Sequence, residues 1–254
     1  MCNQNCSYCY ARADMKWNTL LSFDKIKEGL SLLKDFPRSI ISLIGGEPTL
    51  YPRFSRVLAI VRDLDHEGHI YTNGTTKFFD TADLVLASNF TWTFSYHLGE
   101  TDDEIFFRNI EKFVANDIKV ELTVPAQNMT KVLLELIVRM KINTVITFIH
   151  DVTNGDNDKD IIEDWVYDIK LPHLKNMARF NDVPVHFKGY ECDYNEIDVV
   201  DNYMRSNDCN HNIDMKMTEE NLNTIKEYQK TICSRESCKL DCAFLLPKKR
   251  IPNE

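Results

Sequence analysis

Three cysteines, Cys2, Cys6 and Cys9, stand within the first nine residues, separated by three residues and then by two. Thiols this close in sequence cannot all lie on one regular helix or strand, so they predict a loop wrapped around a soft-metal centre. Three ligands are one fewer than the four that a [4Fe–4S] cluster or a structural zinc ion takes. A metal centre with an open position binds something else there, so the spacing predicts a catalytic site.

Two glycine-containing motifs follow, each after a short run typical of a buried strand. The run 39–44 is rich in β-branched residues and ends in segment 45–48, Gly-Gly-Glu-Pro. A second run ends in segment 72–74, Thr-Asn-Gly. Glycines directly after a strand allow a ligand to approach the backbone closely. Taken alone, each motif is a weak signal, and an ordinary turn is the better explanation of the first.

The three motifs together, in this order, resemble the radical S-adenosylmethionine (radical SAM) superfamily. The resemblance implies that Cys2, Cys6 and Cys9 ligate a [4Fe–4S] cluster whose fourth iron binds the amino and carboxylate groups of S-adenosylmethionine (SAM). It also implies that further residues contact SAM. Tyr8 would lie near the adenine, and the backbones of Gly45 and Gly46 together with the Glu47 carboxylate would lie near the ammonium. The Asn73 amide would lie near the ligand, and Ser95 and His97 near the ribose or carboxylate.

Other interpretations of these residues stay open. The N-terminal cysteines could bind zinc with a fourth cysteine from the tail, or be spare thiols. Tyr8 could pack as an ordinary aromatic residue. Ser95 and His97 point to the same face of a strand and could form a hydrogen-bonded interior pair without a ligand. No residue is assigned a catalytic role beyond cofactor binding.

Charge and composition exclude several classes of protein. The net charge of −9 argues against a nucleic-acid-binding surface. No stretch approaches the length of a membrane span, and no signal peptide precedes Cys2. Eight cysteines in a chain of 254 residues without a secretion signal favour metal binding over disulfides. We therefore expect a cytoplasmic, oxygen-sensitive protein.

Strand and helix patterns alternate over the first 190 or so residues, which predicts βαβ units and a parallel sheet. We expect strands at 39–44, 69–72, 90–96, 118–124, 144–149 and 183–188, with a helical region ending near Met177. The pattern fits an α/β fold, the partial (β/α)6 TIM-like barrel of the radical SAM superfamily, over residues 1–183. A strand normally precedes the cysteine loop in that family, so we also expect the first strand to be missing and strand 39–44 to be an edge.

The second group of cysteines lies in the tail and comprises Cys192, Cys209, Cys233, Cys238 and Cys242. Short strands around the pair Asp201 and Asn202 predict a tight hairpin, and 218–231 reads as a helix. This arrangement over residues 184–254 resembles the twitch extension, a short relative of the SPASM domain. The resemblance implies an auxiliary [4Fe–4S] cluster, although a zinc site or no metal is also compatible with five cysteines.

The predicted function is that of a radical SAM oxidoreductase, similar to a maturase. It would cleave SAM reductively to a 5′-deoxyadenosyl radical and abstract hydrogen from a substrate, for which a peptide or protein side chain is favoured. An electron donor such as flavodoxin or ferredoxin would be its partner, with no nucleic acid or membrane. The alternatives are a non-catalytic iron–sulfur or zinc-binding module and a degenerate, truncated radical SAM homologue.

Overall fold

The computed structural model describes residues 1–6, 9, 21–35, 38–125, 128–147, 166, 169 and 171–176, and short segments between 190 and 250. Those segments are 190–192, 197–200, 203–206, 214–216, 218, 220, 231–232 and 249–250. The chain divides into two compact units, Met1–Phe23 with Arg38–Arg179, and Asp24–Pro37 with Phe180–Glu254. No helix among these residues has the length and apolar character needed to cross a bilayer.

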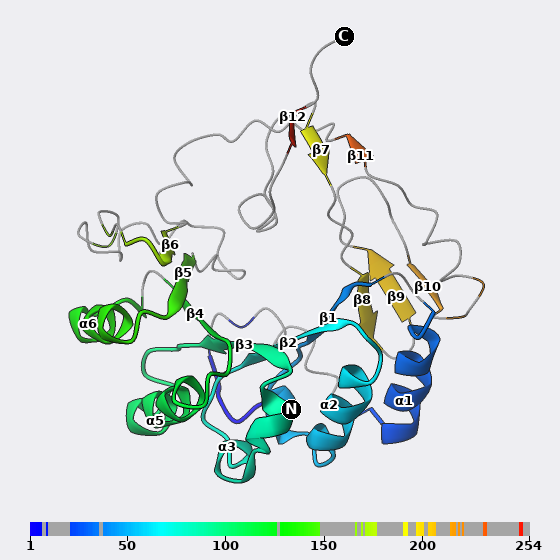
Figure 1. Ribbon diagram of the computed structural model, residues 1–254, viewed down its shortest axis with the longest axis horizontal. Coiled ribbons are helices and arrows are strands. Elements are labelled where there is room, and N and C mark those ends of the chain that lie inside the picture. The colour runs from blue at the N-terminus through cyan, green and yellow to red at the C-terminus, as the bar shows by residue number, and fades with distance from the viewer. Residues whose placement is uncertain are drawn as a thin grey trace. The chain divides into compact units, whose positions relative to one another are not determined.

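The first unit is built on a parallel sheet of six strands in the order β1-β2-β3-β4-β5-β6 (Figure 1). The strands are β1 (Ile40–Leu43), β2 (Glu67–Thr72), β3 (Phe90–Ser95), β4 (Val120–Pro125), β5 (Asn143–Thr147) and β6 (Leu174–Asn176). Each neighbouring pair is parallel, so the predicted α/β class with a parallel sheet is confirmed. Strand order follows chain order, which brings the loops after β1, β2 and β3 together at one edge.

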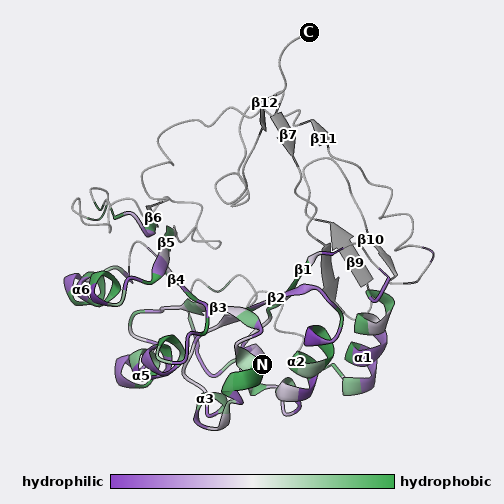
Figure 2. Cartoon of the chain, in the orientation of Figure 1, coloured by the Kyte–Doolittle hydropathy of each residue, from purple (hydrophilic) through white to green (hydrophobic). Residues whose placement is uncertain are grey.

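Helical segments connect the strands: η2 (Pro48–Leu50), α2 (Phe54–Arg62), α3 (Phe78–Thr81), α4 (Leu84–Ala87), α5 (Asp103–Val114) and α6 (Lys131–Met140). Local capping explains two of these starts. The Asp102 carboxylate accepts from the Ile105 N–H, and the Thr130 hydroxyl accepts from the Leu133 N–H. Figure 2 shows hydrophobic and hydrophilic residues on different sides of α5 and α6, as expected of helices that bury one face.

The core lies between the sheet and these helices. Trp92, Phe94, Phe79, Phe106 and Phe113 are all buried completely and pack ring against ring, with the Trp92 and Phe113 centroids 5.1 Å apart. Alternation along each strand turns the next residues to the opposite face of the sheet. There His69, Thr93 and Glu121 lie side by side, with His69 Nε2 2.7 Å from Thr93 Oγ1 and 3.7 Å from Glu121 Oε2. The face away from the helices is therefore polar.

The second unit contains helix α1 (Phe23–Leu32), most of which falls in this unit, and two small sheets. One sheet joins β8 (Ile197–Val200), β9 (Tyr203–Ser206) and β10 (Asp214–Lys216). The other joins β7 (Tyr190–Cys192), β11 (Thr231–Ile232) and β12 (Lys249–Arg250). Strands β8 and β9 are antiparallel, with Val200 opposite Tyr203, which confirms the predicted hairpin around residues 201–202.

The region before residue 177 departs from the prediction. The sequence pattern predicts helix up to about Met177, whereas Leu174–Asn176 forms β6 and pairs parallel with β5. A strand of three residues is too short to show a period of two, so pairing with β5 decides its conformation. The expected strand 183–188 lies outside the described residues. Strand β1 is at one end of the sheet order, as expected of an edge.

Candidate functional site

The N-terminal cysteine loop lies against the loops that follow β1, β2 and β3. The Met1 carbonyl accepts from the Glu47 N–H at 2.8 Å, after β1. The Asn3 side chain contacts the loop after β2, donating to Thr75 Oγ1 at 3.1 Å. These partners are far apart in the sequence and meet because parallel strands end at the same edge of the sheet. The three predicted motifs therefore belong to one site.

The loop after β3 supplies a third attachment that the sequence analysis missed. Glu100 accepts from the Asn5 backbone N–H at 3.0 Å, and the Gln4 amide donates to Thr101 Oγ1 at 3.2 Å. The signal was present, because polar residues directly follow a predicted strand here as they do at the other two motifs. The cysteine loop is thus held from three directions.

The two glycines after β1 differ in their surroundings. A Cβ on Gly46 would stand 2.7 Å from the Met1 carbonyl carbon, closer still to its oxygen, and 3.2 Å from Cys2 N. Position 46 therefore has no room for a side chain, because the cysteine loop occupies the space where a Cβ would stand. At Gly45, with φ +151°, no described residue has an atom within 4 Å of that position. Of the two, Gly45 is the glycine with space for a ligand beside its backbone.

Glu47 joins the first two motifs. Its side chain is 4% exposed, and Oε1 accepts from Thr49 N–H at 3.1 Å, from Thr49 Oγ1 at 2.5 Å and from Thr72 Oγ1 at 2.8 Å. Oε2 accepts from the Asn73 N–H at 2.7 Å. Burial raises the pKa of this carboxyl, and the same hydrogen bonds oppose that rise. Glu47 therefore holds the loop after β2 beside the loop after β1.

Asn73 occupies the centre of the second motif and is 5% exposed. Its amide nitrogen lies 2.7 Å from Asn3 Oδ1 and 3.8 Å from the sulfur of Cys2. Its amide oxygen accepts from the Thr75 N–H at 3.1 Å and from Thr75 Oγ1 at 3.0 Å. The side chain predicted to lie near the ligand thus contacts the cysteine loop directly.

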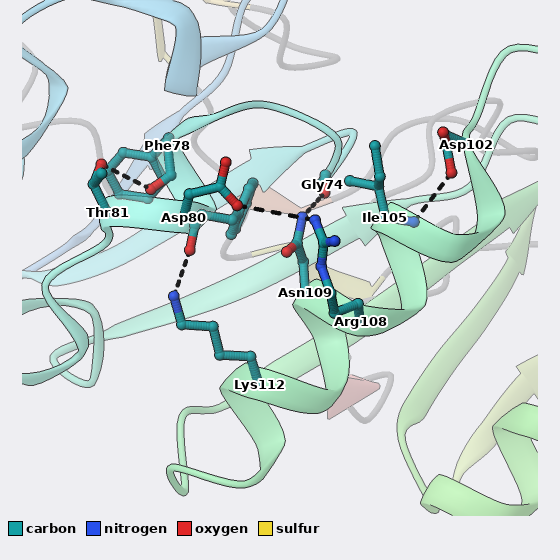
Figure 3. A network of polar contacts seen from close by, with 10 residues as sticks. Gly74, Phe78, Asp80, Thr81, Asp102, Ile105, Arg108, Asn109 and Lys112 are labelled. Atoms are coloured by element: carbon teal, nitrogen blue, oxygen red, sulfur yellow. Dashed lines mark hydrogen bonds and ion pairs between the residues drawn. The ribbon is translucent and has the colours of Figure 1, made fainter.

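Gly74 is held from the helical side of the sheet. Its φ of +68° favours glycine, and a Cβ there would meet the rings of Phe94 and Phe106. The buried Asn109 amide on α5 donates to the Gly74 carbonyl at 2.7 Å (Figure 3). In the same network Lys112 donates to the Phe79 carbonyl. Helix α5 therefore fixes the backbone of the second motif.

Ser95 and His97 lie at and just after the end of β3, on the side expected from the sequence. Ser95 is opposite Thr123 of β4 in the sheet register. The His97 N–H donates to Thr101 Oγ1 at 3.0 Å. Burial lowers the pKa of His97, and the charge of Glu100 opposes the shift. Both residues lie at the strand edge where the cysteine loop is attached.

The three N-terminal cysteines form no disulfide. Cys6 is buried, while Cys2 and Cys9 are half-buried. Burial raises the pKa of Cys6 to about 11, with smaller contributions from Glu100, Cys2 and Cys9. Cys6 is a thiol at neutral pH, so any metal that binds it must displace a proton.

This donor set suits a cluster. Among the described residues, no three His, Cys, Asp or Glu side chains are placed to hold one metal ion. In a [4Fe–4S] cube each cysteine binds a different iron atom, so the sulfurs surround the group and need not meet at a point. Three neighbouring thiols in a loop with fixed ends therefore fit such a cube.

The remaining predicted ligands lie largely outside the described residues. This holds for Tyr8, which is predicted to contact SAM, and for four tail cysteines, Cys209, Cys233, Cys238 and Cys242. The backbone of Cys192 ends β7, opposite Thr231 of β11. Their roles stay predictions.

Known proteins match parts of this chain. A nucleotide dehydratase dependent on S-adenosylmethionine, from Thermoplasmatales archaeon strain ISO4-H5, is 34% identical over 74 residues, 29% of this chain and 26% of the relative. The Fe-coproporphyrin III synthase of Methanosarcina barkeri is 35% identical over 75 residues, 29% of this chain and 19% of that enzyme. The matched part of this chain thus spans about a quarter or less of each curated relative.

Streptococcus suis SuiB, in its crystal structure bound to precursor peptide SuiA, shares the fold. The TM-score is 0.51 at 17% sequence identity, over 69% of this chain and 46% of SuiB. The family model described as the radical SAM superfamily matches residues 1–165, which contain the cysteine loop and every strand end that contacts it. The chain belongs to the radical SAM superfamily.

Proposed function

We propose that this protein is a radical SAM enzyme that cleaves SAM reductively and abstracts hydrogen from a substrate. The single observation that carries the proposal is the attachment of the cysteine loop to both glycine motifs, through Met1 and Glu47 and through Asn3 and Asn73. Gly46 is required by the cysteine loop itself, whereas Gly45 beside it leaves space at its backbone for a ligand. Family membership supports the same reaction class.

Cys2, Cys6 and Cys9 would hold the [4Fe–4S] cluster. When bound, the cluster supplies the electron that cleaves SAM into methionine and a 5′-deoxyadenosyl radical. The chain's own residues keep the loop in place: Glu47 and Asn73 fix the two motifs, and Glu100 fixes Asn5.

The SAM-binding residues are proposed from the same geometry. Gly45 has open space beside its backbone, so it would receive the ammonium group more readily than Gly46. Ser95 and His97 at the end of β3 would face the ribose or carboxylate, and Tyr8 the adenine. The Glu47 carboxylate is occupied by four hydrogen bonds, so its contribution to SAM would be to position the loops.

SAM cleavage without substrate tests the proposal. Anaerobically reconstituted protein with dithionite and SAM should accumulate 5′-deoxyadenosine and methionine, measured by chromatography with mass spectrometry. The variant carrying Cys2→Ala, Cys6→Ala and Cys9→Ala should produce none above background, because it lacks the cluster ligands. A wild-type protein that holds its clusters and makes no 5′-deoxyadenosine would favour the degenerate homologue, and a protein that binds zinc alone would favour the non-catalytic module.

We further propose that residues 184–254 form a twitch-like extension with an auxiliary [4Fe–4S] cluster, beyond a barrel of residues 1–183. Fully loaded protein should then contain about eight iron atoms per chain. Four of Cys192, Cys209, Cys233, Cys238 and Cys242 should resist alkylation until a chelator removes the metal, as mass spectrometry of the labelled peptides can show. Uniform reactivity of all five in the iron-loaded protein would contradict the auxiliary cluster.

A peptide or protein side chain is the proposed substrate. The fold neighbour SuiB is bound to a precursor peptide in its structure, and the polar sheet face with His69, Thr93 and Glu121 suits a substrate that offers hydrogen bonds. The two curated relatives bear names of small-molecule enzymes, so a nucleotide or tetrapyrrole substrate is the competing result. We also propose a flavodoxin or ferredoxin as electron donor and a cytoplasmic location.

A further inference from the structure

The orientation of the Asn73 side chain is determined by its neighbours. The Thr75 backbone N–H is a donor only, so the Asn73 amide atom 3.1 Å from it must be the oxygen. The other atom of the amide is therefore the NH2 group, which has two hydrogens to donate. One points to Asn3 Oδ1 at 2.7 Å, and the remaining hydrogen is available to the sulfur of Cys2 at 3.8 Å.

The position of this amide is also rigid. Asn73 is 5% exposed, its backbone N–H is held by Glu47, and the next residue, Gly74, is held by Asn109 of α5. A polar group with fixed backbone and side-chain partners keeps its direction when a neighbour changes charge. The fixed amide therefore keeps a hydrogen directed at the sulfur of Cys2.

We propose that the Asn73 amide is a direct hydrogen-bond donor to the sulfur of Cys2 and raises the reduction potential of the cluster held there. The inference rests on the proposed function, because it requires a cluster at Cys2, Cys6 and Cys9. A thiolate ligand of a reduced cluster carries more negative charge than that of an oxidised one, so a donor on the sulfur stabilises the reduced state more. Asn73 then acts on the cluster's redox chemistry, and its contact to Asn3 holds the loop in register.

A neighbouring charge acts in the opposite direction. Glu100 accepts from the Asn5 backbone N–H at 3.0 Å, next to Cys6 in the chain. A carboxylate this close also disfavours the extra electron of a reduced cluster. The Asn73 hydrogen bond opposes that effect at the other end of the loop, on the first cysteine of the three.

Midpoint potentials test the inference independently of turnover. The measurement follows the electron paramagnetic resonance signal of the reduced N-terminal cluster. This signal is identified by its absence from the variant in which Cys2, Cys6 and Cys9 are replaced by alanine. In a redox titration without SAM, Asn73→Ala should lower the midpoint, because the donor is lost. Asn73→Asp should lower it further, because an oxygen with negative charge then faces the sulfur while Oδ1 still accepts from Thr75.

Thr75→Val is the matched control. It removes the hydroxyl contacts to Asn73 and Asn3 but keeps the backbone N–H that orients the amide, so its midpoint should equal that of the wild type. Equal midpoints in wild type and both Asn73 variants would overturn the inference. Loss of the cluster from both Asn73 variants, with Thr75→Val still loaded, would overturn it too, since Asn73 would then assemble the loop. A wild type without this signal would instead refute the proposed function.

Discussion

The variant Gly46→Ala is expected to lose the N-terminal cluster, which is about four iron atoms per chain, and with it all SAM cleavage. The sequence alone attributes the need for glycine to a closely approaching ligand. The structure places the Met1 carbonyl and Cys2 N where the Cβ would stand. These are backbone atoms that cannot rotate away, so the added carbon must displace the cysteine loop and break the bond from Glu47 N–H to the Met1 carbonyl.

Gly45→Ala separates this effect from backbone strain. Its Cβ meets no atom of the described residues within 4 Å, although φ of +151° is unfavourable for alanine. We expect Gly45→Ala to cost about 1 kcal/mol of stability and to retain its iron. Iron analysis, the visible absorption of the cluster and 5′-deoxyadenosine formation should be compared in both variants. Full iron content in Gly46→Ala would show that the loop is not anchored there.

Glu47→Ala is expected to reduce the free energy of unfolding of the metal-free protein by about 2–6 kcal/mol. The Thr49 and Thr72 hydroxyls retain other partners, Thr76 Oγ1 and the Gly74 N–H respectively. The backbone N–H groups of Thr49 and Asn73 lose the only acceptor that they have among the described residues, and each buried unpaired donor costs about 1–3 kcal/mol. Urea denaturation followed by tryptophan fluorescence gives the value, because Trp92 is buried in the same unit.

Glu47→Gln removes one contact selectively. The amide oxygen of the introduced glutamine should take the place of Oε1, which accepts three hydrogen bonds. The NH2 group of the glutamine then faces the Asn73 N–H, so two donors meet where Oε2 accepted before. We expect about 1–3 kcal/mol of destabilisation, and disturbance of the loop after β2 more than of the loop after β1. A Gln variant as unstable as the Ala variant would show that the charge of Glu47 matters more than its separate contacts.

The stability contributed by Glu47 should also depend on pH. Burial raises its pKa in the folded protein above the value of about 4.3 for a free glutamate. A carboxyl with a raised folded pKa stabilises the fold fully below its unfolded pKa and loses that contribution as the pH rises through the folded value. As the pH rises through that interval, the wild type should therefore lose free energy of unfolding relative to Glu47→Gln. A difference independent of pH would contradict the raised pKa.

The sequence by itself determined which elements form. The starts of α5 and α6 depend on local contacts, because Asp102 and Thr130 lie within three residues of the N–H groups that they accept from. The cysteine spacing and the glycine motifs indicated the site for the same reason, since each is a local pattern. Where the local pattern was too short, as at Leu174–Asn176, the expectation was wrong.

Only the tertiary structure decided what these residues do at the site. Glu47 and Asn73 are 26 residues apart, and Asn73 and Asn3 are 70 apart. Their contacts arise because β1, β2 and β3 are adjacent and parallel. Strand order and register depend on the summed packing of the whole sheet, which no single segment contains. The sequence therefore predicted that Gly46, Glu47 and Asn73 belong to a site, and the sheet edge brings all three against the cysteine loop.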